Sequence, residues 1–182
     1  AAHPRVAHFS LDDMYLTKPE RVWRADNISS FNAVRDEDGN FQIAHFPRPD
    51  VERLLLTRGP PGSHDLPLAK AVIARPREPL LSKLPRFDKA ADDRAPAPDW
   101  PVFQGPAEAI LVDGWCLGAK PPPPTEPINE IECEDADGIW RRETETQLRK
   151  THAPFYAAFA AAGLAYGPLF QNVRSLRARL AS

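Results

Sequence analysis

Residues 6–17 read VAHFSLDDMYLT, and residues 109–118 read AILVDGWCLG. Each stretch opens with a short apolar run and continues into carboxylates, Asp12 and Asp13 in the first and Asp113 in the second. Short apolar runs of this kind are typical of buried strands in a parallel sheet. Because open α/β sheets bind ligands beyond the carboxyl ends of their strands, we predict an α/β fold with a site at that edge.

Composition excludes several classes of protein. The chain has 182 residues, enough for one domain or most of one, and is 42% hydrophobic and 26% charged. A net charge of -2 gives no electrostatic reason to bind nucleic acid or an anionic membrane. No segment reaches the roughly 18 apolar residues that span a bilayer. Because Cys116 and Cys133 make no disulfide framework, we expect a cytoplasmic protein.

Between the two strands, the pattern predicts short helices and long irregular connections. Thr17 is a favourable N-cap for a helix that begins at residue 18. Further helices are expected over residues 51–57, 63–73 and 139–164, with Pro154 interrupting the last one. The 21 prolines of the chain favour irregular backbone elsewhere.

Three connecting segments stand out. Residues 24–52 contain few periodic apolar positions, so we expect an insertion that forms a loop or a small hairpin around Asp38. Residues 83–106 are polar and proline-rich, with Trp100 as their anchor. Residues 119–127 include four consecutive prolines and are expected to form a stiff connector.

The carboxylates suit phosphoryl transfer, which needs a magnesium ion and a group that orients or deprotonates the acceptor hydroxyl. Of Asp12 and Asp13, one could act as general base while the other holds water on magnesium. Asp113 ends an apolar strand, as the acid of a Walker B element does. Each has a plainer alternative, because Asp12 or Asp13 could cap the next helix, and many strands end in an Asp-Gly turn.

Two polar loops supply candidate binding residues. The first loop surrounds a Gly-Pro-Pro-Gly turn, the second follows Pro85, and their candidates are Arg58, His64, Asp65, Arg86, Asp88, Lys89 and Arg94. Arginine forks and lysine charges suit carboxylate and phosphate oxygens. The alternative is a solvated surface on which these charges pair with one another. Trp115 could cover a substrate pocket or belong to the core.

Taken together, these blocks resemble the D-glycerate 3-kinase family of P-loop kinases, the plant-type glycerate kinases. The matching strings cover most of residues 6–142 in the family's order: SLDDMYLT, RGPPGSHD, LPRFDKAADDR, WPVFQGP, ILVDGWCLG and EPINEIECEDADGIWRR. The resemblance implies a P-loop kinase-like parallel sheet with flanking helices. It also implies transfer of a phosphoryl group from ATP, with Mg2+, to the 3-hydroxyl of D-glycerate.

The resemblance also assigns roles to residues. It implies that Asp12 or Asp13 serves the acceptor hydroxyl and that Tyr15 lines the same pocket. Arg58, His64, Arg86 and Lys89 would contact substrate or phosphate. Asp12 and Asp113 would hold magnesium, although Asp113 stands where the family usually has glutamate, one methylene longer.

The sequence departs from the family pattern at the nucleotide site. It contains no GxxxxGK followed by Ser or Thr, so the P-loop strand and helix are expected to be missing and the nucleotide-binding residues are unknown. We therefore interpret residues 1–182 as one partial kinase domain, from a fragment or a diverged gene. The alternatives are a kinase for a nucleoside or pantothenate, or a non-catalytic remnant that binds a partner or an anion. The sequence does not indicate an oligomeric state.

Overall fold

The computed structural model describes residues 5–29, 31–35, 38, 41–45, 48–114, 116–120 and 135–161. The two strands predicted from the sequence, β1 (Val6–Ser10) and β8 (Ala109–Asp113), pair in parallel. Their register runs from Val6 opposite Ala109 to Ser10 opposite Asp113, so both strands end at one edge. The predicted α/β class, with a small parallel sheet, is confirmed.

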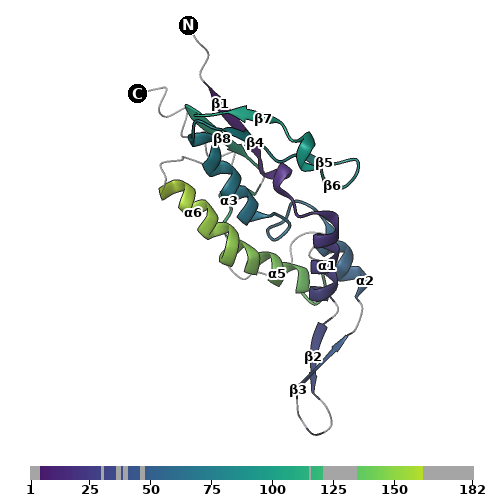
Figure 1. Cartoon of the computed structure of the whole chain (residues 1–182). Coiled ribbons are helices and arrows are strands. Elements are labelled where there is room, and N and C mark those ends of the chain that lie inside the picture. The colour runs from purple at the N-terminus through teal and green to yellow at the C-terminus, as the bar shows by residue number, and fades with distance from the viewer. Residues whose placement is uncertain are drawn as a thin grey trace.

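Other strands form three antiparallel pairs. They are β2 (Phe31–Arg35) with β3 (Phe41–His45), β4 (Leu81–Lys83) with β7 (Val102–Gln104), and β5 (Phe87–Asp88) with β6 (Asp93–Arg94). The β2–β3 hairpin extends away from the body of the molecule (Figure 1). It lies in the segment where a loop or hairpin was expected. The four short strands β4 to β7 were not predicted, because two or three residues are too few to show an alternating pattern.

Helices cover one side of the parallel pair (Figure 1). The α-helices are α1 (Lys18–Ser29), α2 (Pro49–Leu56), α3 (Leu66–Ala74), α5 (Ile139–Gln147) and α6 (Ala153–Ala161). Short helical turns are η1 (Leu11–Met14), η2 (Arg75–Arg77), η3 (Ala97–Asp99) and the π-helical η4 (Leu148–His152). We expected Pro154 to interrupt the last helix, but the helix continues through it. Pro154 is the second residue of α6, just after π-helical η4, and a π turn is a known way for a helix to accommodate a proline.

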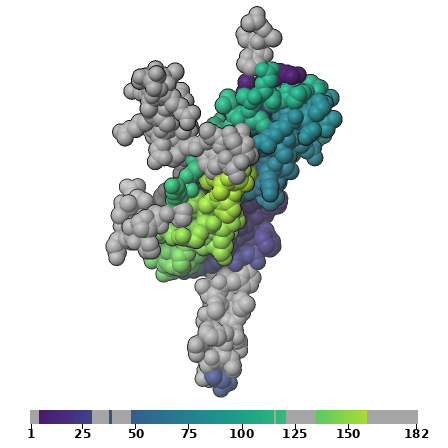
Figure 2. Space-filling view, turned by 90° about the vertical axis from the view of Figure 1, so that its left-hand side faces the viewer, coloured from purple at the N-terminus to yellow at the C-terminus, as the bar shows by residue number. Residues whose placement is uncertain are grey.

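The main core lies between β1, α3 and α6. Inward-facing Ala7 and Phe9 of β1 are buried, whereas Val6 and His8 are exposed, which is the alternation of a strand with one covered face. Leu11 and Met14 of η1 extend the same core. Figure 2 shows the yellow-green surface of α6 beside the blue-teal surface of the α3 region, with purple α1 below.

Residues 109–112 were predicted as a buried strand, but β8 is covered on only part of its surface. Leu111 of β8 is 58% exposed, and Val6 of β1 is 38% exposed. Among the described residues, β8 pairs only with β1. One face of this strand pair is therefore open, in contrast to parallel sheets that are covered on both faces.

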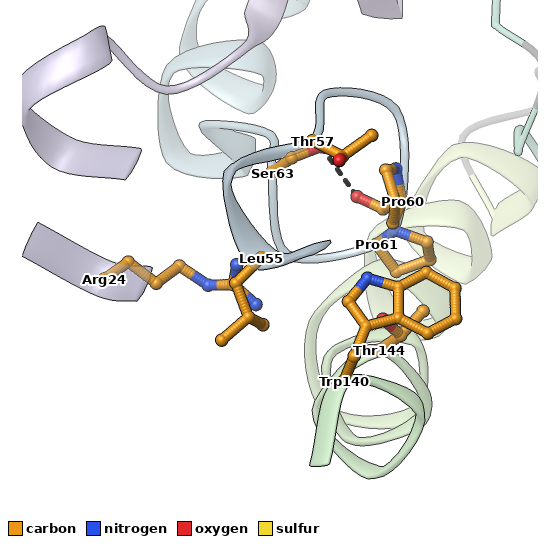
Figure 3. A pocket seen from close by; sticks show the side chains of 8 residues that line it. All are labelled: Arg24, Leu55, Thr57, Pro60, Pro61, Ser63, Trp140 and Thr144. Atoms are coloured by element: carbon orange, nitrogen blue, oxygen red, sulfur yellow. Dashed lines mark hydrogen bonds between the residues drawn. The ribbon is translucent and has the colours of Figure 1, made fainter. Parts of the chain in front are cut away.

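A second, smaller core joins α1, α2 and α5 under the Gly-Pro-Pro-Gly turn. Trp140 of α5 lies close to Pro61 of this turn (Figure 3). Ser63 closes the turn, because its hydroxyl donates to the Pro60 carbonyl at 2.7 Å. Gly62 has a φ of +96°, a backbone conformation that favours glycine. A Cβ there would lie 2.6 Å from the Arg24 guanidinium, which would have to move aside.

Within the described ranges, no helix is both long enough and apolar enough to span a bilayer.

Candidate active site

The ends of β1 and β8 are joined through Ser10. Its hydroxyl donates to Asp113 Oδ1 at 2.7 Å and accepts from the Asp12 amide at 3.3 Å. The other Asp113 oxygen contacts His8 Nε2 at 2.5 Å. Asp12 and Asp113 are thereby held at the same edge of the sheet, the position where α/β sheets bind their ligands.

Asp12 accepts hydrogen bonds from two side chains. The Tyr15 hydroxyl donates to Oδ1 at 2.9 Å, and Lys89 Nζ donates to Oδ2 at 3.0 Å. Burial raises the pKa of Asp12, but the bonds from Lys89 and Tyr15 outweigh it and hold that pKa below its ordinary value. Burial, and then the Asp12 carboxylate, raise the pKa of Tyr15. Asp12 is therefore ionised and Tyr15 stays a hydrogen-bond donor at neutral pH.

Asp13 points to a different place. Its Oδ1 accepts the amide of Phe87 at 3.0 Å and so ties η1 to the β5–β6 loop. The same side chain lines a polar groove of about 810 Å³ together with Arg86, Asp88 and Lys89. The two adjacent aspartates thus have different roles, because Asp12 faces Lys89 and Tyr15, while Asp13 anchors the loop that carries Lys89.

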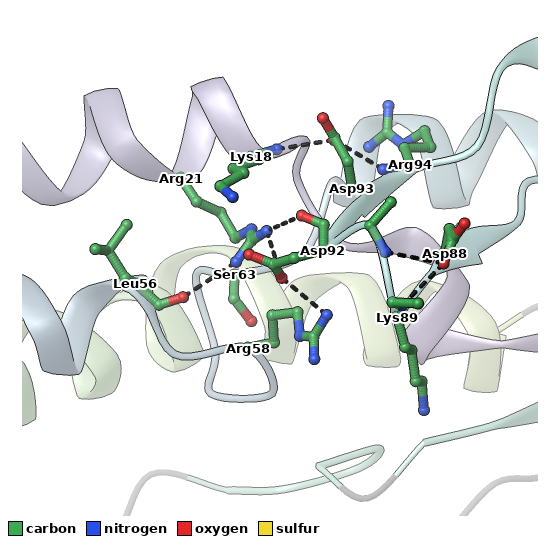
Figure 4. Close-up of polar contacts among 12 residues, drawn as sticks. Lys18, Arg21, Leu56, Arg58, Ser63, Asp88, Lys89, Asp92, Asp93 and Arg94 are labelled. Carbon is green, nitrogen blue, oxygen red and sulfur yellow. Dashed lines mark hydrogen bonds and ion pairs between the residues drawn. The ribbon is translucent and has the colours of Figure 1, made fainter.

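Asp92 connects two arginines at the end of this loop (Figure 4). Its Oδ1 lies 2.9 Å from Arg21 Nη2 and 2.8 Å from Arg58 Nη1. Both guanidinium groups also lie over the Phe87 ring, at 5.7 Å for Arg21 and 5.2 Å for Arg58. The edge of that ring meets Tyr15 at a centroid distance of 5.3 Å. Arg58 therefore belongs to the same cluster as Tyr15.

Asp65, Arg94 and Asp88 are held by local structure. Asp65 caps α3 by accepting from the Leu68 amide at 2.9 Å, and its other oxygen accepts from Arg94 Nη2 at 3.0 Å. Arg94 also donates to the Tyr15 carbonyl at 2.7 Å. Asp88 accepts two amides of its own turn, which lower its pKa. Local bonds thus hold these three residues in place, and Asp88 and Arg94 also line the polar groove. Their predicted contact with substrate stays a prediction.

His64 is turned inward. It is 6% exposed, stacks on Tyr15 at a centroid distance of 4.8 Å, and its Nδ1 lies 3.4 Å from Nε2 of the fully buried His152. Its Nε2 has no hydrogen-bond partner within the described part of the chain. Burial, and then the neighbouring His152, lower the pKa of His64 to about 3. His64 therefore supports Tyr15 as a neutral ring.

The structure brings together Asp12, Tyr15, Arg58, Lys89 and Asp113 and places Asp13 and Arg86 in the adjoining groove. Trp115 lies outside the described residues. Sequence reasoning gave no role in the site to five residues of this cluster: His8, Ser10, Arg21, Asp92 and His152. Only Ser10 carried a signal, since it directly precedes the Leu-Asp-Asp string. A helical arginine such as Arg21 looks like any surface charge until the tertiary structure is known.

The site offers oxygen ligands of the kind that magnesium prefers. Protein Mg2+ sites commonly use one or two carboxylates, with waters and substrate phosphates completing the shell. Asp113 and Asp12, joined through Ser10, fit that donor set. In the described ranges, no group of three or more His, Cys, Asp or Glu residues could hold a metal by itself.

Carboxylates at the ends of parallel strands, one of them paired with a lysine, are compatible with an α/β phosphotransferase. Over 78 residues, the chain is 44% identical to chloroplastic D-glycerate 3-kinase of Arabidopsis thaliana. This match spans 38% of the chain and 17% of that protein. It confirms the predicted resemblance: the matched segment is related to the D-glycerate 3-kinase family. No family model matches the chain.

One solved structure supports the fold. D-glycerate 3-kinase from Cryptococcus neoformans matches with a TM-score of 0.50 and 23% identity, over 86% of this chain and 49% of that one. The YGR205w protein matches with a TM-score of 0.47 and 21% identity, over 78% of this chain and 45% of that one. The chain therefore spans about half the length of these solved relatives.

Proposed function

We propose that this chain carries the acceptor side of an ATP-dependent kinase that phosphorylates the 3-hydroxyl of D-glycerate. One observation carries the proposal: the ionised Asp12 carboxylate accepts from Lys89 at the strand ends, where Ser10 links the Asp12 amide to Asp113. Arg58 belongs to the same cluster, because it lies over the Phe87 ring, whose edge meets Tyr15. An acceptor with a hydroxyl and a carboxylate needs a base for the first and a cation for the second.

Asp12 is our candidate for the general base. Its charge is maintained by Lys89 and Tyr15, which donate to opposite oxygens and leave further acceptor capacity on each. Lys89 and Arg58 are the cations available to neutralise a bound carboxylate or phosphate. Asp13 acts through the loop, since its bond to the Phe87 amide fixes the strand that precedes Lys89.

Asp113 and Asp12 are the residues that would hold magnesium. Bound there, Mg2+ would neutralise charge on the transferring phosphoryl group. The sequence contains no phosphate-binding loop, so we assign no residue of this chain to the triphosphate of ATP. We propose a single partial kinase domain over residues 1–182, with residues 24–52 as an insertion and residues 119–127 as a connector. A cytoplasmic location stays a prediction.

Titration calorimetry on the purified chain tests the acceptor. D-glycerate is titrated alone and with Mg-ATP present, and phosphoglycerate formation is followed in parallel. We expect binding of D-glycerate and, if turnover occurs, a loss of about 100-fold or more in Asp12→Asn. Glu78→Gln removes an exposed acid without a described ion pair and serves as the matched control. A folded chain that binds no D-glycerate contradicts the proposal.

A second candidate is a non-catalytic protein that binds a small anion on the same cations. Lys89 and Arg58 favour it, because these cations suit a carboxylate or phosphate whether or not ATP is bound. D-glycerate binding that is indifferent to Mg-ATP, with no product formed, would support this candidate. Binding of a nucleoside or of pantothenate in place of D-glycerate would instead support a kinase with another acceptor.

A further inference from the structure

A buried arginine and a strained aspartate converge behind Arg58. Arg21 is 3% exposed and donates to three backbone carbonyls, those of Leu16 at 3.3 Å, Leu56 at 3.2 Å and Asp92 at 2.6 Å. It also pairs with the Asp92 carboxylate. Arg21 therefore fixes the end of the β5–β6 loop, backbone and side chain together, to α1 and the end of α2.

Asp92 adopts an unusual backbone conformation. Its φ is +56°, in the left-handed region that residues other than glycine rarely occupy. Such conformations persist where the surroundings determine them, and they concentrate at functional sites. Here the conformation lets one residue present both its carbonyl and its carboxylate to Arg21 while the carboxylate also accepts from Arg58.

Arg58 is held on one side and open on the other. Nη1 donates to Asp92, and the guanidinium lies over the Phe87 ring. Within the described part of the chain, its Nε and Nη2 have no hydrogen-bond partner, and its side chain is 30% exposed. The guanidinium is close enough to Tyr15 to lower that hydroxyl's pKa, against the larger effects that raise it. Phe87 meets Tyr15, and Tyr15 donates to Asp12, so the free side of this guanidinium belongs to the cluster that holds Asp12 and can donate to a substrate carboxylate there.

We infer that Arg21 and Asp92 are positioning residues that hold Arg58 as the receptor for the carboxylate of the acceptor substrate. The substrate class is a small hydroxy acid, with its hydroxyl on Asp12 and its carboxylate on Arg58. This inference rests on the proposed function. A guanidinium that is already fixed loses little conformational entropy when it binds a carboxylate. This pre-organisation should raise the affinity for a hydroxy acid but not for an uncharged polyol.

The first measurement is the side-chain order of Arg58 in the ligand-free chain. NMR of the arginine Nε–H groups reports it in the wild type, in Asp92→Asn and in Glu78→Gln. Asparagine tolerates a positive φ, so Asp92→Asn retains the turn while it removes the charge. We expect the Arg58 signal to become mobile in Asp92→Asn and to stay ordered in Glu78→Gln. An equally ordered Arg58 in Asp92→Asn overturns the inference, whatever the chain binds.

The second measurement is selectivity, by titration of D-glycerate and of glycerol, which lacks the carboxylate. We expect Asp92→Asn to weaken D-glycerate binding about tenfold or more and to leave glycerol binding unchanged, as loss of a well-placed charged contact would do. Glu78→Gln should bind both as the wild type does. Unchanged D-glycerate affinity in Asp92→Asn overturns the inference and leaves the proposed function intact. Failure of the wild type to bind D-glycerate overturns both.

Discussion

The buried histidine pair makes the stability of this protein depend on pH in a calculable way. His64 and His152 face each other in the interior, with Tyr15, Asp12, Arg24 and Tyr156 as their neighbours that ionise or carry charge. Burial lowers the pKa of His152 to about 4, as it lowers that of His64 to about 3. An unfolded histidine has a pKa of about 6.5.

The sign follows from proton uptake. Above the pKa of the unfolded state, the histidines are neutral in both states and the free energy of unfolding does not change. As the pH falls below that pKa, the unfolded state binds protons that the folded state does not bind, so stability decreases until the folded pKa is reached. Between pH 7.5 and 5.5 each histidine costs about 1.4 kcal/mol, or about 3 kcal/mol for the pair. For a chain of this size, that lowers the melting temperature by about 6–12 °C.

Urea unfolding at pH 7.5, 6.5 and 5.5 measures this loss, with His64→Gln, His152→Gln and the double variant beside the wild type. Each single variant should lose about half as much stability as the wild type, and the double variant should lose almost none. A wild-type stability that stays flat over this range would refute the reasoning. If the variants do not fold, histidine NMR decides: both rings should remain neutral in the folded wild type down to pH 5.

Two further perturbations test the scaffold and the site. Lys89→Met removes one donor to Asp12, so the pKa of Asp12 should rise in an NMR titration of its carboxyl carbon. An unchanged pKa would mean that the Lys89 contact does not form in solution. Gly105→Ala would place a Cβ well inside van der Waals contact with the Glu78 carbonyl oxygen, a backbone atom that cannot rotate away. The free energy of unfolding in urea should therefore fall by about 3 kcal/mol, and a decrease below about 1 kcal/mol would contradict the close approach.

The parts of the fold predicted from the sequence are those that local pattern determines. Apolar runs that end in carboxylates predicted β1 and β8 and their shared edge, because strand period and the geometry of parallel sheets require little tertiary knowledge. The hairpin near Asp38 carried a turn signal. The exposure of Leu111 could not be predicted, since an apolar run does not reveal how many of its faces are covered.

The site divides in the same way. Asp12, Lys89 and Arg58 were identified by residue type, whereas their partners are set by tertiary contacts. Arg21 is a helical arginine in sequence, and only packing makes it the buried partner of Asp92. His64 was expected at the substrate, but its ring is stacked beneath Tyr15. Residue type predicts which side chains can perform a reaction; it does not predict which of them face solvent.

The turn η1 explains why separate blocks of the sequence act as one site. From residues 58–65, the Ser63 carbonyl accepts from the Leu16 amide at 2.9 Å, and the Asp65 amide donates to the Met14 carbonyl at 2.7 Å. From the β5–β6 loop, the Phe87 amide donates to Asp13. Both loops are therefore bonded to the few residues that present Asp12. A change in either loop can therefore shift that carboxylate through these bonds or, for the β5–β6 loop, through Lys89 itself. The three blocks are constrained together even though some 40 to 80 positions separate them along the chain.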